Sequence, residues 1–193
     1  MGLEFPDKKY SIIYADPPWG SNSQFGRDKN KGNPQHYQLM SLDDIKNLSV
    51  NLLAEDNCVL FLWVVDCQLP DAFGVIKAWG FTYKTVGFVW NKSTITDKDH
   101  FGVGMWTRKN SELCLLATKG SPKRENAGVR QLQRHMVREH SRKPDEIKAE
   151  IVKLCGDKPR IELFSRCATI GWDCWGLEVG LFSPITMENS NGT

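Results

Sequence analysis

The sequence lacks the features that mark secreted, membrane-spanning and metal-binding proteins. None of its six cysteines forms a C-x-x-C pair, and its four histidines form no ligand-like pair, so neither a metal site nor a disulfide framework is expected. No charged-then-apolar leader stands at the N-terminus, and no run of about 18 apolar residues predicts a membrane span. These absences favour a cytoplasmic protein with reduced, mostly buried thiols and no membrane partner.

The chain also lacks a large excess of charge of either sign. Its 193 residues carry a formal net charge of +2, which is too small to indicate a nucleic-acid partner by itself. The distribution is uneven, because residues 119–143 hold eight basic residues against two acidic ones and the remainder is acidic overall. Such a segment, which includes Lys123 and Arg124, suits phosphate neutralisation, with a solvated charged face as the alternative.

Apolar runs of strand length alternate with amphipathic stretches, which predicts an α/β fold with a mostly parallel sheet and helices on both faces. Expected strands are residues 11–15, 58–65, 81–90, 111–118 and 160–164, and expected helices begin near residues 41, 69 and 144. This length predicts one domain over residues 1–185, and the polar residues 186–193 are expected to form a disordered tail.

The tetrapeptide Asp16-Pro17-Pro18-Trp19 follows the first expected strand. Its prolines cannot donate ladder hydrogen bonds, so the motif would lie at the carboxyl end of that strand, where open α/β sheets bind ligands. The Asp16 carboxylate and the Pro17 carbonyl are adjacent acceptors that would localise the lone pair of a planar amine and aim it at an electrophilic methyl group. Trp19 offers a flat face for a base. A turn that happens to contain two prolines is the alternative.

Two long polar segments carry further candidate residues. Residues 20–38 are interpreted as a substrate-binding lid or as a solvated loop, and Tyr37 would bring an aromatic ring back towards the motif. Residues 91–110 contain Trp106 and Arg108, which suit base stacking or backbone binding, with simple loop packing as the alternative.

The C-terminal half offers groups for a nucleotide-type cofactor. Lys143 precedes an expected helix, where its ammonium group and the helix dipole together would hold a carboxylate. Glu178 follows the last expected strand, where an acid commonly binds ribose hydroxyls.

Together these pieces resemble the adenine N-6 methyltransferases typified by the catalytic subunit of the messenger-RNA adenosine methyltransferase complex, which include small bacterial and phage members. The matching stretches run from Tyr10 to Glu178 and are YADPPW, HYQLMSLDDI, CVLFLWV, GVGMWTRKNSELCLLATKG, HSRKPDEI and RIELFSRCATIGWDCWG. The resemblance implies a Rossmann-like fold, a cofactor-binding half C-terminal to the catalytic motif, and S-adenosylmethionine as methyl donor.

The resemblance also implies roles for particular residues. Tyr37 and Glu112 would line the base pocket, Lys143 would pair with the methionine carboxylate, and Arg166 and Glu178 would meet the ribose side. The full expected set is catalytic Asp16, Pro17, Pro18 and Trp19; cofactor-binding Asp16, Lys143, Phe164, Ser165, Arg166 and Glu178; and substrate-binding Tyr37, Trp106, Arg108, Glu112, Lys123 and Arg124.

The sequence departs from the family pattern at two places. Leu177 stands where members often have Asn, so one hydrogen bond to the cofactor is expected to be missing or replaced. In the larger eukaryotic members a segment well upstream of the catalytic motif contacts the cofactor adenine, whereas only nine residues precede Tyr10, so Pro6-Asp7 or another loop would have to make this contact. Neither departure touches the catalytic tetrapeptide.

The expected function is methyl transfer from S-adenosylmethionine to the 6-amino group of adenine in DNA. The alternatives are the same reaction on RNA, a catalytically silent nucleic-acid-binding subunit of a two-chain methyltransferase, and, as a weaker rival, cytosine methylation. The acid whose loss would favour a silent subunit, Asp16, is present. The sequence leaves open whether the protein is a monomer or a dimer.

Overall fold

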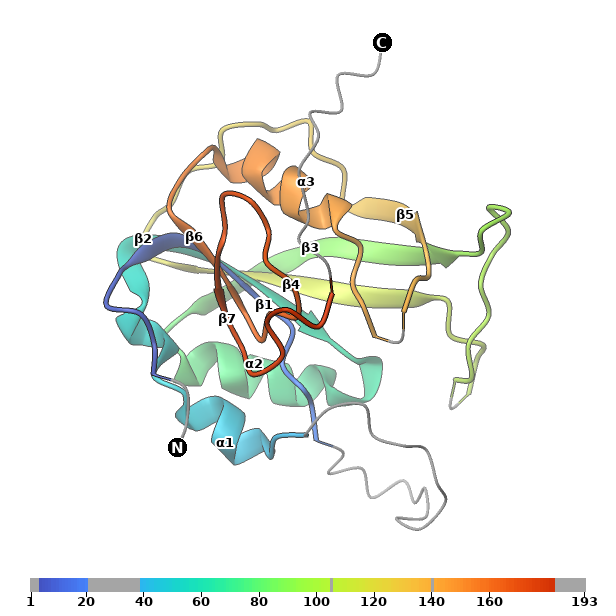
Figure 1. Ribbon diagram of the computed structural model, residues 1–193, viewed down its shortest axis with the longest axis horizontal. Coiled ribbons are helices and arrows are strands. Elements are labelled where there is room, and N and C mark those ends of the chain that lie inside the picture. The colour runs from blue at the N-terminus through green and yellow to red at the C-terminus, as the bar shows by residue number, and fades with distance from the viewer. Residues whose placement is uncertain (1–3, 21–38, 105, 140, 183–193) are drawn as a thin grey trace.

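A single twisted sheet organises the chain, whose computed structural model describes residues 4–20, 39–104, 106–139 and 141–182 (Figure 1). Within these residues seven strands lie in the order β5-β3-β4-β2-β1-β6-β7. They are β1 (Tyr10–Ala15), β2 (Ala54–Val64), β3 (Thr82–Ser93), β4 (Ser111–Lys119), β5 (Leu132–Met136), β6 (Arg160–Leu163) and β7 (Asp173–Trp175). Only β4 runs antiparallel to its neighbours in this part of the chain, so the mostly parallel sheet predicted from the sequence is confirmed.

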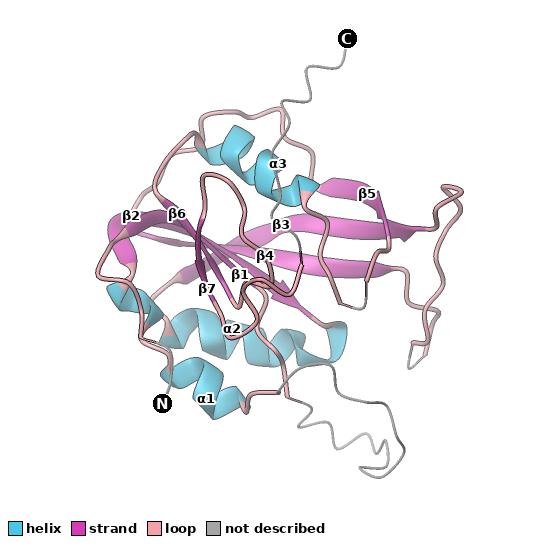
Figure 2. Cartoon of the chain, in the orientation of Figure 1, coloured by secondary structure: helices cyan, strands magenta, loops and turns pink. Residues whose placement is uncertain are grey.

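Helices cover both faces of the sheet, as the alternating pattern predicts (Figure 2). Helices α1 (Leu42–Asn47) and α2 (Leu69–Ala78) lie on one face, and α3 (Glu146–Cys155) lies on the other. Adjacent residues of β1 point to the two layers: Ile13 packs in the core beneath α1 and α2, whereas Tyr14 packs in the core beneath α3. Two short 3-10 helices, Val50–Leu52 and Asp66–Gln68, belong to the connections.

Local sequence signals explain where the helices begin and end. Ser41 caps α1, since its hydroxyl oxygen accepts a hydrogen bond from the Asp44 backbone N–H at 3.1 Å. Helix α3 begins at Glu146, two residues after the start expected at Pro144, and is followed by Gly156, whose φ of +87° favours glycine. None of the described helices combines the length and apolar character needed to cross a membrane.

Two strands were missing from the sequence prediction, and two others, β2 and β3, are longer than expected, since β2 begins at Ala54 rather than at residue 58. β5 lies inside the basic segment and β7 is very short, so neither carries an apolar period long enough to be recognised. Both form because they pair with a neighbour: β5 pairs in parallel with the end of β3, and β7 pairs with β6. β3 itself continues to Ser93, beyond the predicted end at residue 90.

Candidate active site

The parallel strands β1 and β6 end side by side, with Ala15 of β1 opposite Leu163 of β6. A cleft opens just beyond these ends, on the side of the sheet that α3 covers. Its lining includes Asp16 after β1, Phe164 and Arg166 after β6, and Lys143 before α3. The structure therefore brings the acid of the tetrapeptide together with three of the predicted cofactor-binding residues.

The tetrapeptide is a fixed part of the fold rather than a loose turn. The Trp19 backbone N–H donates to the Pro17 carbonyl at 2.8 Å, and the Trp19 indole N–H donates to the Trp63 carbonyl at 3.0 Å. The Met40 backbone N–H donates to the Pro18 carbonyl at 2.9 Å. Because a carbonyl oxygen has two lone pairs, the Pro17 oxygen keeps one for a further donor.

A chain of alternating charges leads from the tetrapeptide into the sheet. The Lys143 ammonium lies 2.8 Å from Asp16 Oδ2 and 3.3 Å from Oε2 of Glu112, which is buried on β4. On the other side of Glu112, the Lys92 ammonium lies 2.5 Å from Oε1. The four side chains thus form the sequence Lys92, Glu112, Lys143, Asp16, in which every neighbour carries the opposite charge. Glu112 therefore reaches the cleft through Lys143 and is not among the cleft-lining residues.

The two carboxylates of this chain differ in their pKa values. Desolvation raises the pKa of Asp16, and the ammonium of Lys143, which Asp16 shares with Glu112, only partly opposes the shift. Desolvation also acts on Glu112, but the ammonium groups of Lys143 and Lys92 outweigh it and lower the pKa to about 2. Glu112 therefore stays ionised at pH values at which Asp16 already takes up a proton.

The turn that follows β6 carries several of the residues that the sequence predicts to bind the cofactor. Phe164 has a φ of +61°, an uncommon left-handed conformation for a bulky residue, and its ring packs edge-on against Trp175. Arg166 Nε lies 3.3 Å from Glu178 Oε2, so the two residues predicted for the ribose side form an ion pair.

Ser165, also predicted to bind the cofactor, is used differently. It is buried, and its hydroxyl donates to Glu162 Oε2 at 2.9 Å or to the Cys167 carbonyl at 2.8 Å. Its side chain is thus engaged within the protein and is not among the cleft-lining residues.

Several cleft residues were missed in the sequence. Lys148 is 2 % exposed, and its ammonium lies 2.6 Å from Glu162 Oε2 and 2.7 Å from Thr169 Oγ1. Glu162 offered a signal, because a charge inside the apolar strand 160–164 needs a partner. Lys148 offered none, since a lysine in an amphipathic helix normally belongs to the solvated face. The other lining residues not expected are Tyr14, Ser141, Arg142, Pro144, Asp145, Cys167 and Phe182.

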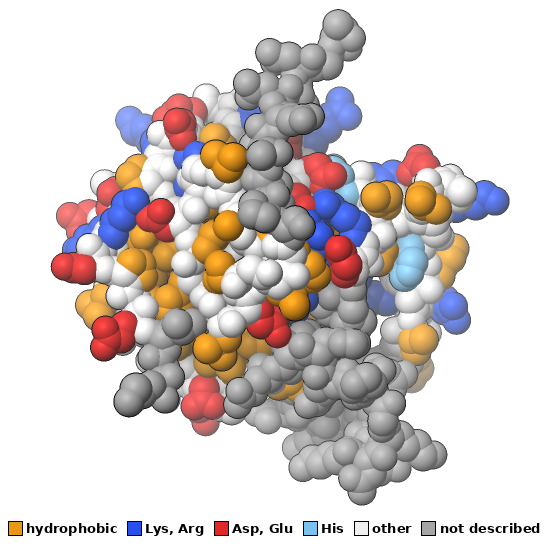
Figure 3. Space-filling view, viewed as in Figure 1, with side chains coloured by type: hydrophobic (Ala, Val, Ile, Leu, Met, Phe, Trp, Pro, Cys, Tyr) orange, Lys and Arg blue, Asp and Glu red, His pale blue; other side chains and the backbone are white. Residues whose placement is uncertain are grey.

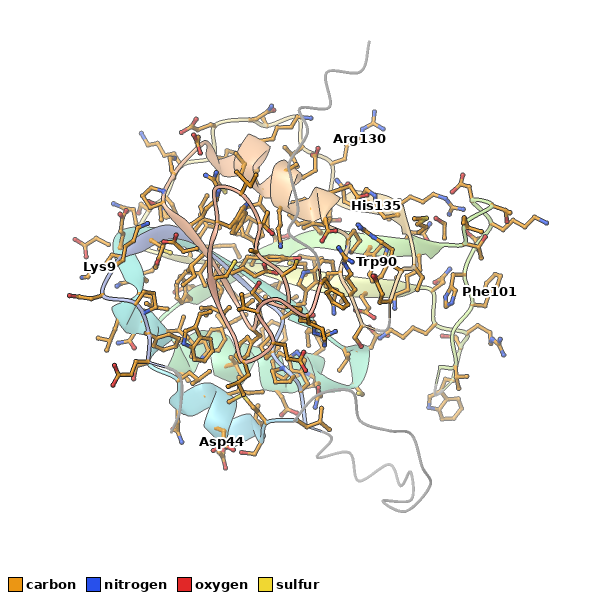
Figure 4. All side chains as sticks on the ribbon, in the orientation of Figure 1. Lys9, Asp44, Trp90, Phe101, Arg130 and His135 are labelled. Atoms are coloured by element: carbon orange, nitrogen blue, oxygen red, sulfur yellow. The ribbon has the colours of Figure 1, made fainter. Side chains whose placement is uncertain are left out.

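Other predicted site residues lie away from the cleft or outside the described residues. Trp106 is 98 % exposed and Arg108 is also exposed, on the loop between β3 and β4 that carries Phe101 (Figure 4). This loop projects beyond the ends of its two strands (Figure 1). Tyr37 lies outside the described residues.

The basic segment does not gather at the cleft. Lys123 and Arg124 follow Lys119, which pairs with Cys58 in the first half of β2, and the next residue, Glu125, donates through its N–H to the Leu154 carbonyl of α3. These residues therefore lie at the end of the sheet opposite to Asp16, and the structure does not bring Lys123 and Arg124 to the site.

Much of the remaining positive charge of this segment is already paired. Arg134 bonds to Asp97 and Asp99, and Arg138 and Arg142 both bond to Asp145. On the face shown in Figure 3, basic and acidic side chains are interspersed rather than gathered by sign. The sequence-based inference of a free phosphate-binding arm is therefore weakened by the ion pairs that folding creates.

The two departures from the family pattern also have places in the fold. Leu177 is 79 % exposed in the turn after β7. The N-terminal segment runs beside β7, because the Phe5 ring packs on Trp175 with centroids 4.6 Å apart and the Trp175 indole N–H donates to the Glu4 carbonyl. The Pro6-Asp7 segment is therefore near the turn that holds Phe164.

The α/β sheet, the D-P-P-W motif at the end of a central strand and the charged cleft beside it define a methyltransferase. The chain belongs to the MT-A70 family, whose model matches residues 10–178. It is 34 % identical over 193 aligned residues to the type II methyltransferase M.MunI of Mycoplasma sp, covering 91 % of this chain and 80 % of that protein.

Eukaryotic proteins are similar over the same region. The chain is 30 % identical to an N(6)-adenosine-methyltransferase MT-A70-like protein of Drosophila melanogaster and 28 % identical to the human N(6)-adenosine-methyltransferase catalytic subunit METTL3, in each case over 82 % of its length. It spans only 24 % and 26 % of these two proteins, so the match concerns about a quarter of each.

Proposed function

We propose that the protein transfers a methyl group from S-adenosylmethionine to the 6-amino group of adenine in DNA. The observation that carries the proposal is the placement of Asp16, the first residue of the tetrapeptide, in a cleft that Lys143, Arg166 and Phe164 also line. The adenosine methyltransferases among the relatives support the reaction. DNA is favoured because the chain covers most of a type II methyltransferase but only about a quarter of the adenosine methyltransferases.

The cleft residues fit the chemistry of S-adenosylmethionine. Lys143 supplies a cation for the methionine carboxylate, and Arg166 supplies a donor suited to ribose hydroxyls. Glu178, which pairs with Arg166 but is not itself among the cleft-lining residues, would supply an acceptor for them. The buried Nε of Arg142, which also lines the cleft, has no hydrogen-bond partner within the described protein and is therefore available to a ligand. Bound there, S-adenosylmethionine would supply an electrophilic methyl group.

The tetrapeptide would hold the acceptor amine. One oxygen of Asp16 is bonded to Lys143, so we assign its other oxygen to one N–H of the adenine amine and the Pro17 carbonyl to the second N–H. Two acceptors fix the orientation of the amine and localise its lone pair on nitrogen. The alkylated amine carries a positive charge and then releases a proton. We assign Asp16 as the acceptor of this proton, because it is the carboxylate of the motif and its pKa is raised.

Adenine in RNA is the second candidate substrate. The similarity to the N(6)-adenosine-methyltransferases favours it, because those proteins are named for action on adenosine. The two substrates differ at the 2′-hydroxyl, so a direct comparison separates them.

We would test the proposal with labelled S-adenosylmethionine and matched single- and double-stranded DNA and RNA, followed by nucleoside mass spectrometry. The label is expected in N-6-methyladenine of DNA. Asp16→Asn should lower turnover by about 10²–10³-fold while retaining cofactor binding. The reason is that Asn keeps its oxygen towards the Lys143 ammonium and presents an NH₂ donor where the amine needs an acceptor.

Asp56→Asn is the matched control, because Asp56 is exposed on β2 and forms no ion pair in the described structure. Label in cytosine, or full turnover by Asp16→Asn, would contradict the mechanism. Cofactor binding without transfer to any nucleic acid would favour a silent subunit instead. The free cysteines suit a reducing compartment, and we infer that the enzyme acts in the cytoplasm.

A further inference from the structure

Glu112 is clamped between two lysines that occupy equivalent positions around it. The Lys92 ammonium lies over the Trp90 ring, 4.7 Å from its centroid, and the Lys143 ammonium lies 5.6 Å from the centroid of Trp63. The two tryptophan rings meet edge to face with their centroids 6.5 Å apart. Each ammonium is thus held between an indole ring and one oxygen of the same carboxylate.

The sheet register explains this arrangement. Trp90 of β3 is the direct partner of Glu112 on β4, and Lys92 follows two residues later on the same face of its strand. Trp63 of β2 pairs with Cys114, again two residues from Glu112 and on the same face. The indole N–H of Trp90 donates to the carbonyl of His135, and both residues are labelled in Figure 4. This bond fixes the ring that lies under Lys92.

Because Lys92, Glu112 and Lys143 are largely buried, the balance of charge among them affects which carboxyl group is protonated. The side chains of Lys92, Glu112 and Lys143 are 16 %, 12 % and 12 % exposed. With Lys92 present, two ammonium groups are in direct contact with the two carboxylates. Without it, Lys143 would have to balance both Glu112 and Asp16, and a largely desolvated site with surplus negative charge favours protonation of one carboxyl group.

Asp16 is the group that would be protonated first. Glu112 has two ammonium neighbours within 3.3 Å, whereas the ammonium in contact with Asp16, that of Lys143, is shared with Glu112. The other titratable or charged groups that act on Asp16 or Glu112 are Tyr14, Lys109, Cys114, Glu162 and Arg166.

We propose that Lys92 is a positioning residue that neutralises one side of Glu112 and so leaves Lys143 to hold Asp16 in its charged, amine-accepting form. Lys92 acts through Glu112 and is not among the residues that line the cleft. The catalytic part of this role rests on the proposed function, whereas the electrostatic coupling between Lys92 and Asp16 does not.

The test compares Lys92→Met, which removes the charge, with Lys92→Arg, which keeps it. Lys92→Gln keeps a hydrogen-bond donor towards Glu112 without the charge. Lys84→Met is the matched control, because Lys84 lies on the same strand, is exposed and forms no ion pair within the described chain. Circular dichroism and thermal denaturation establish that each variant is folded.

Two quantities are measured for each variant. One is the pKa of Asp16, from ¹³C NMR titration of proteins labelled at aspartate carboxyl groups, with the signal assigned by its loss in Asp16→Asn. The other is the pH dependence of kcat/KM for methyl transfer. We expect both the Asp16 pKa and the acidic limb of kcat/KM to rise by about one pH unit in Lys92→Met and Lys92→Gln. Lys92→Arg and Lys84→Met should leave them near the wild-type values.

Each outcome decides one part of the proposal. An unchanged Asp16 pKa in both neutral variants would refute the coupling, even if the wild type methylates adenine. A loss of kcat/KM that is equal at all pH values, without a shifted limb, would show that Lys92 only supports the fold. A shifted Asp16 pKa in a protein that transfers no methyl group would retain the coupling and refute the proposed function.

Discussion

Three carboxylates in and beside the cleft differ in how many ammonium groups face them. Glu112 contacts two, Asp16 contacts that of Lys143, and Glu162 contacts that of Lys148 together with the Ser165 hydroxyl. Desolvation raises the pKa of both Asp16 and Glu162, because one ammonium does not offset it in either case. The number of charged partners, rather than burial alone, therefore decides which of these acids is ionised as pH falls.

Glu112 should accordingly make the stability of the protein depend on pH. Its pKa of about 2 in the folded protein lies below the ordinary value of 4.5, so its contribution is complete above pH 4.5 and disappears as pH falls through 2. A shift of this size corresponds to roughly 3 kcal/mol of unfolding free energy. The wild type should lose about this much unfolding free energy as the pH falls from 4.5 to 2, and Glu112→Gln should not show this part of the loss. Urea denaturation at a series of pH values measures the difference.

Glu150→Gln provides the comparison, since Glu150 forms an ion pair with Lys153 along the surface of α3. It should retain the wild-type pH dependence. If Glu112→Gln and the wild type lose stability in parallel over this pH range, the two lysines do not hold Glu112 in its ionised form.

At the scale of elements, the turn after β6 lines the cleft, and the turn after β7 packs against it. The Ser165 N–H donates to the Trp175 carbonyl at 3.0 Å, which brings Gly176 against the backbone of Ser165. A Cβ atom on Gly176 would lie 2.7 Å from both the nitrogen and the oxygen of Ser165. Glycine at this position therefore allows the two turns to approach closely enough for Arg166 to meet Glu178.

Gly176→Ala should separate these turns. We expect the affinity for S-adenosylmethionine to fall about ten-fold and the unfolding free energy to fall by about 1–3 kcal/mol, as is typical of an overpacked contact. Isothermal titration calorimetry and chemical denaturation measure the two effects.

Gly74→Ala is the matched control within α2. An added Cβ there would meet mainly the flexible end of Lys46, at 3.1 Å, and alanine is the better helix former by about 1 kcal/mol. This variant should bind the cofactor normally. Normal binding by Gly176→Ala would show that the close approach of the two turns does not shape the cofactor site.

The sequence predicted the elements that carry their own signal. The apolar runs of β1, β2 and β4 and the Ser41 cap of α1 follow from local composition. β5 and β7 could not be predicted in this way, because they are short and depend on pairing with β3 and β6. Local patterns do not contain that long-range information.

The same distinction applies to the site. Asp16 and Lys143 could be predicted, because one directly follows an apolar strand and the other directly precedes Pro144, where the sequence predicts the start of a helix, although α3 itself begins at Glu146. Lys92 and Lys148 could not, since a lysine among polar neighbours resembles a surface residue until packing buries it. Lys123 does not reach the cleft because β4 runs antiparallel to β2 and ends at the edge of the sheet opposite to Asp16. The direction of β4 is set when the sheet assembles, so the local sequence around Lys123 does not reveal it.

For the molecule as a whole, ion pairs reduce the charge that is available to a nucleic acid. Arg134, Arg138 and Lys143 all contact acids, although the sequence shows them as part of one basic run. The loop between β3 and β4 instead presents an exposed Trp106 near Arg108. This arrangement favours stacking with a small number of phosphate contacts over broad electrostatic binding.

Nucleic-acid binding should therefore depend only moderately on salt. With about three phosphate contacts, the slope of log K against log salt concentration is expected near −3, whereas engagement of the whole basic segment would bring it to about −7. Trp106→Ala should lower the affinity about ten-fold at every salt concentration without changing the slope, and Arg108→Ala should reduce the slope by about one. Fluorescence anisotropy with a labelled oligonucleotide over a range of salt concentrations measures both quantities.

Two further substitutions decide which surface binds the nucleic acid. Ile95→Ala, at a residue that is 88 % exposed on the same loop, should change neither the affinity nor the slope, because an aliphatic side chain offers no flat face for stacking and no charge for a phosphate. Lys123→Ala should likewise have no effect, since Lys123 lies at the opposite end of the sheet from the cleft. A steep slope that Lys123→Ala reduces would assign binding to the basic segment rather than to the loop of Trp106.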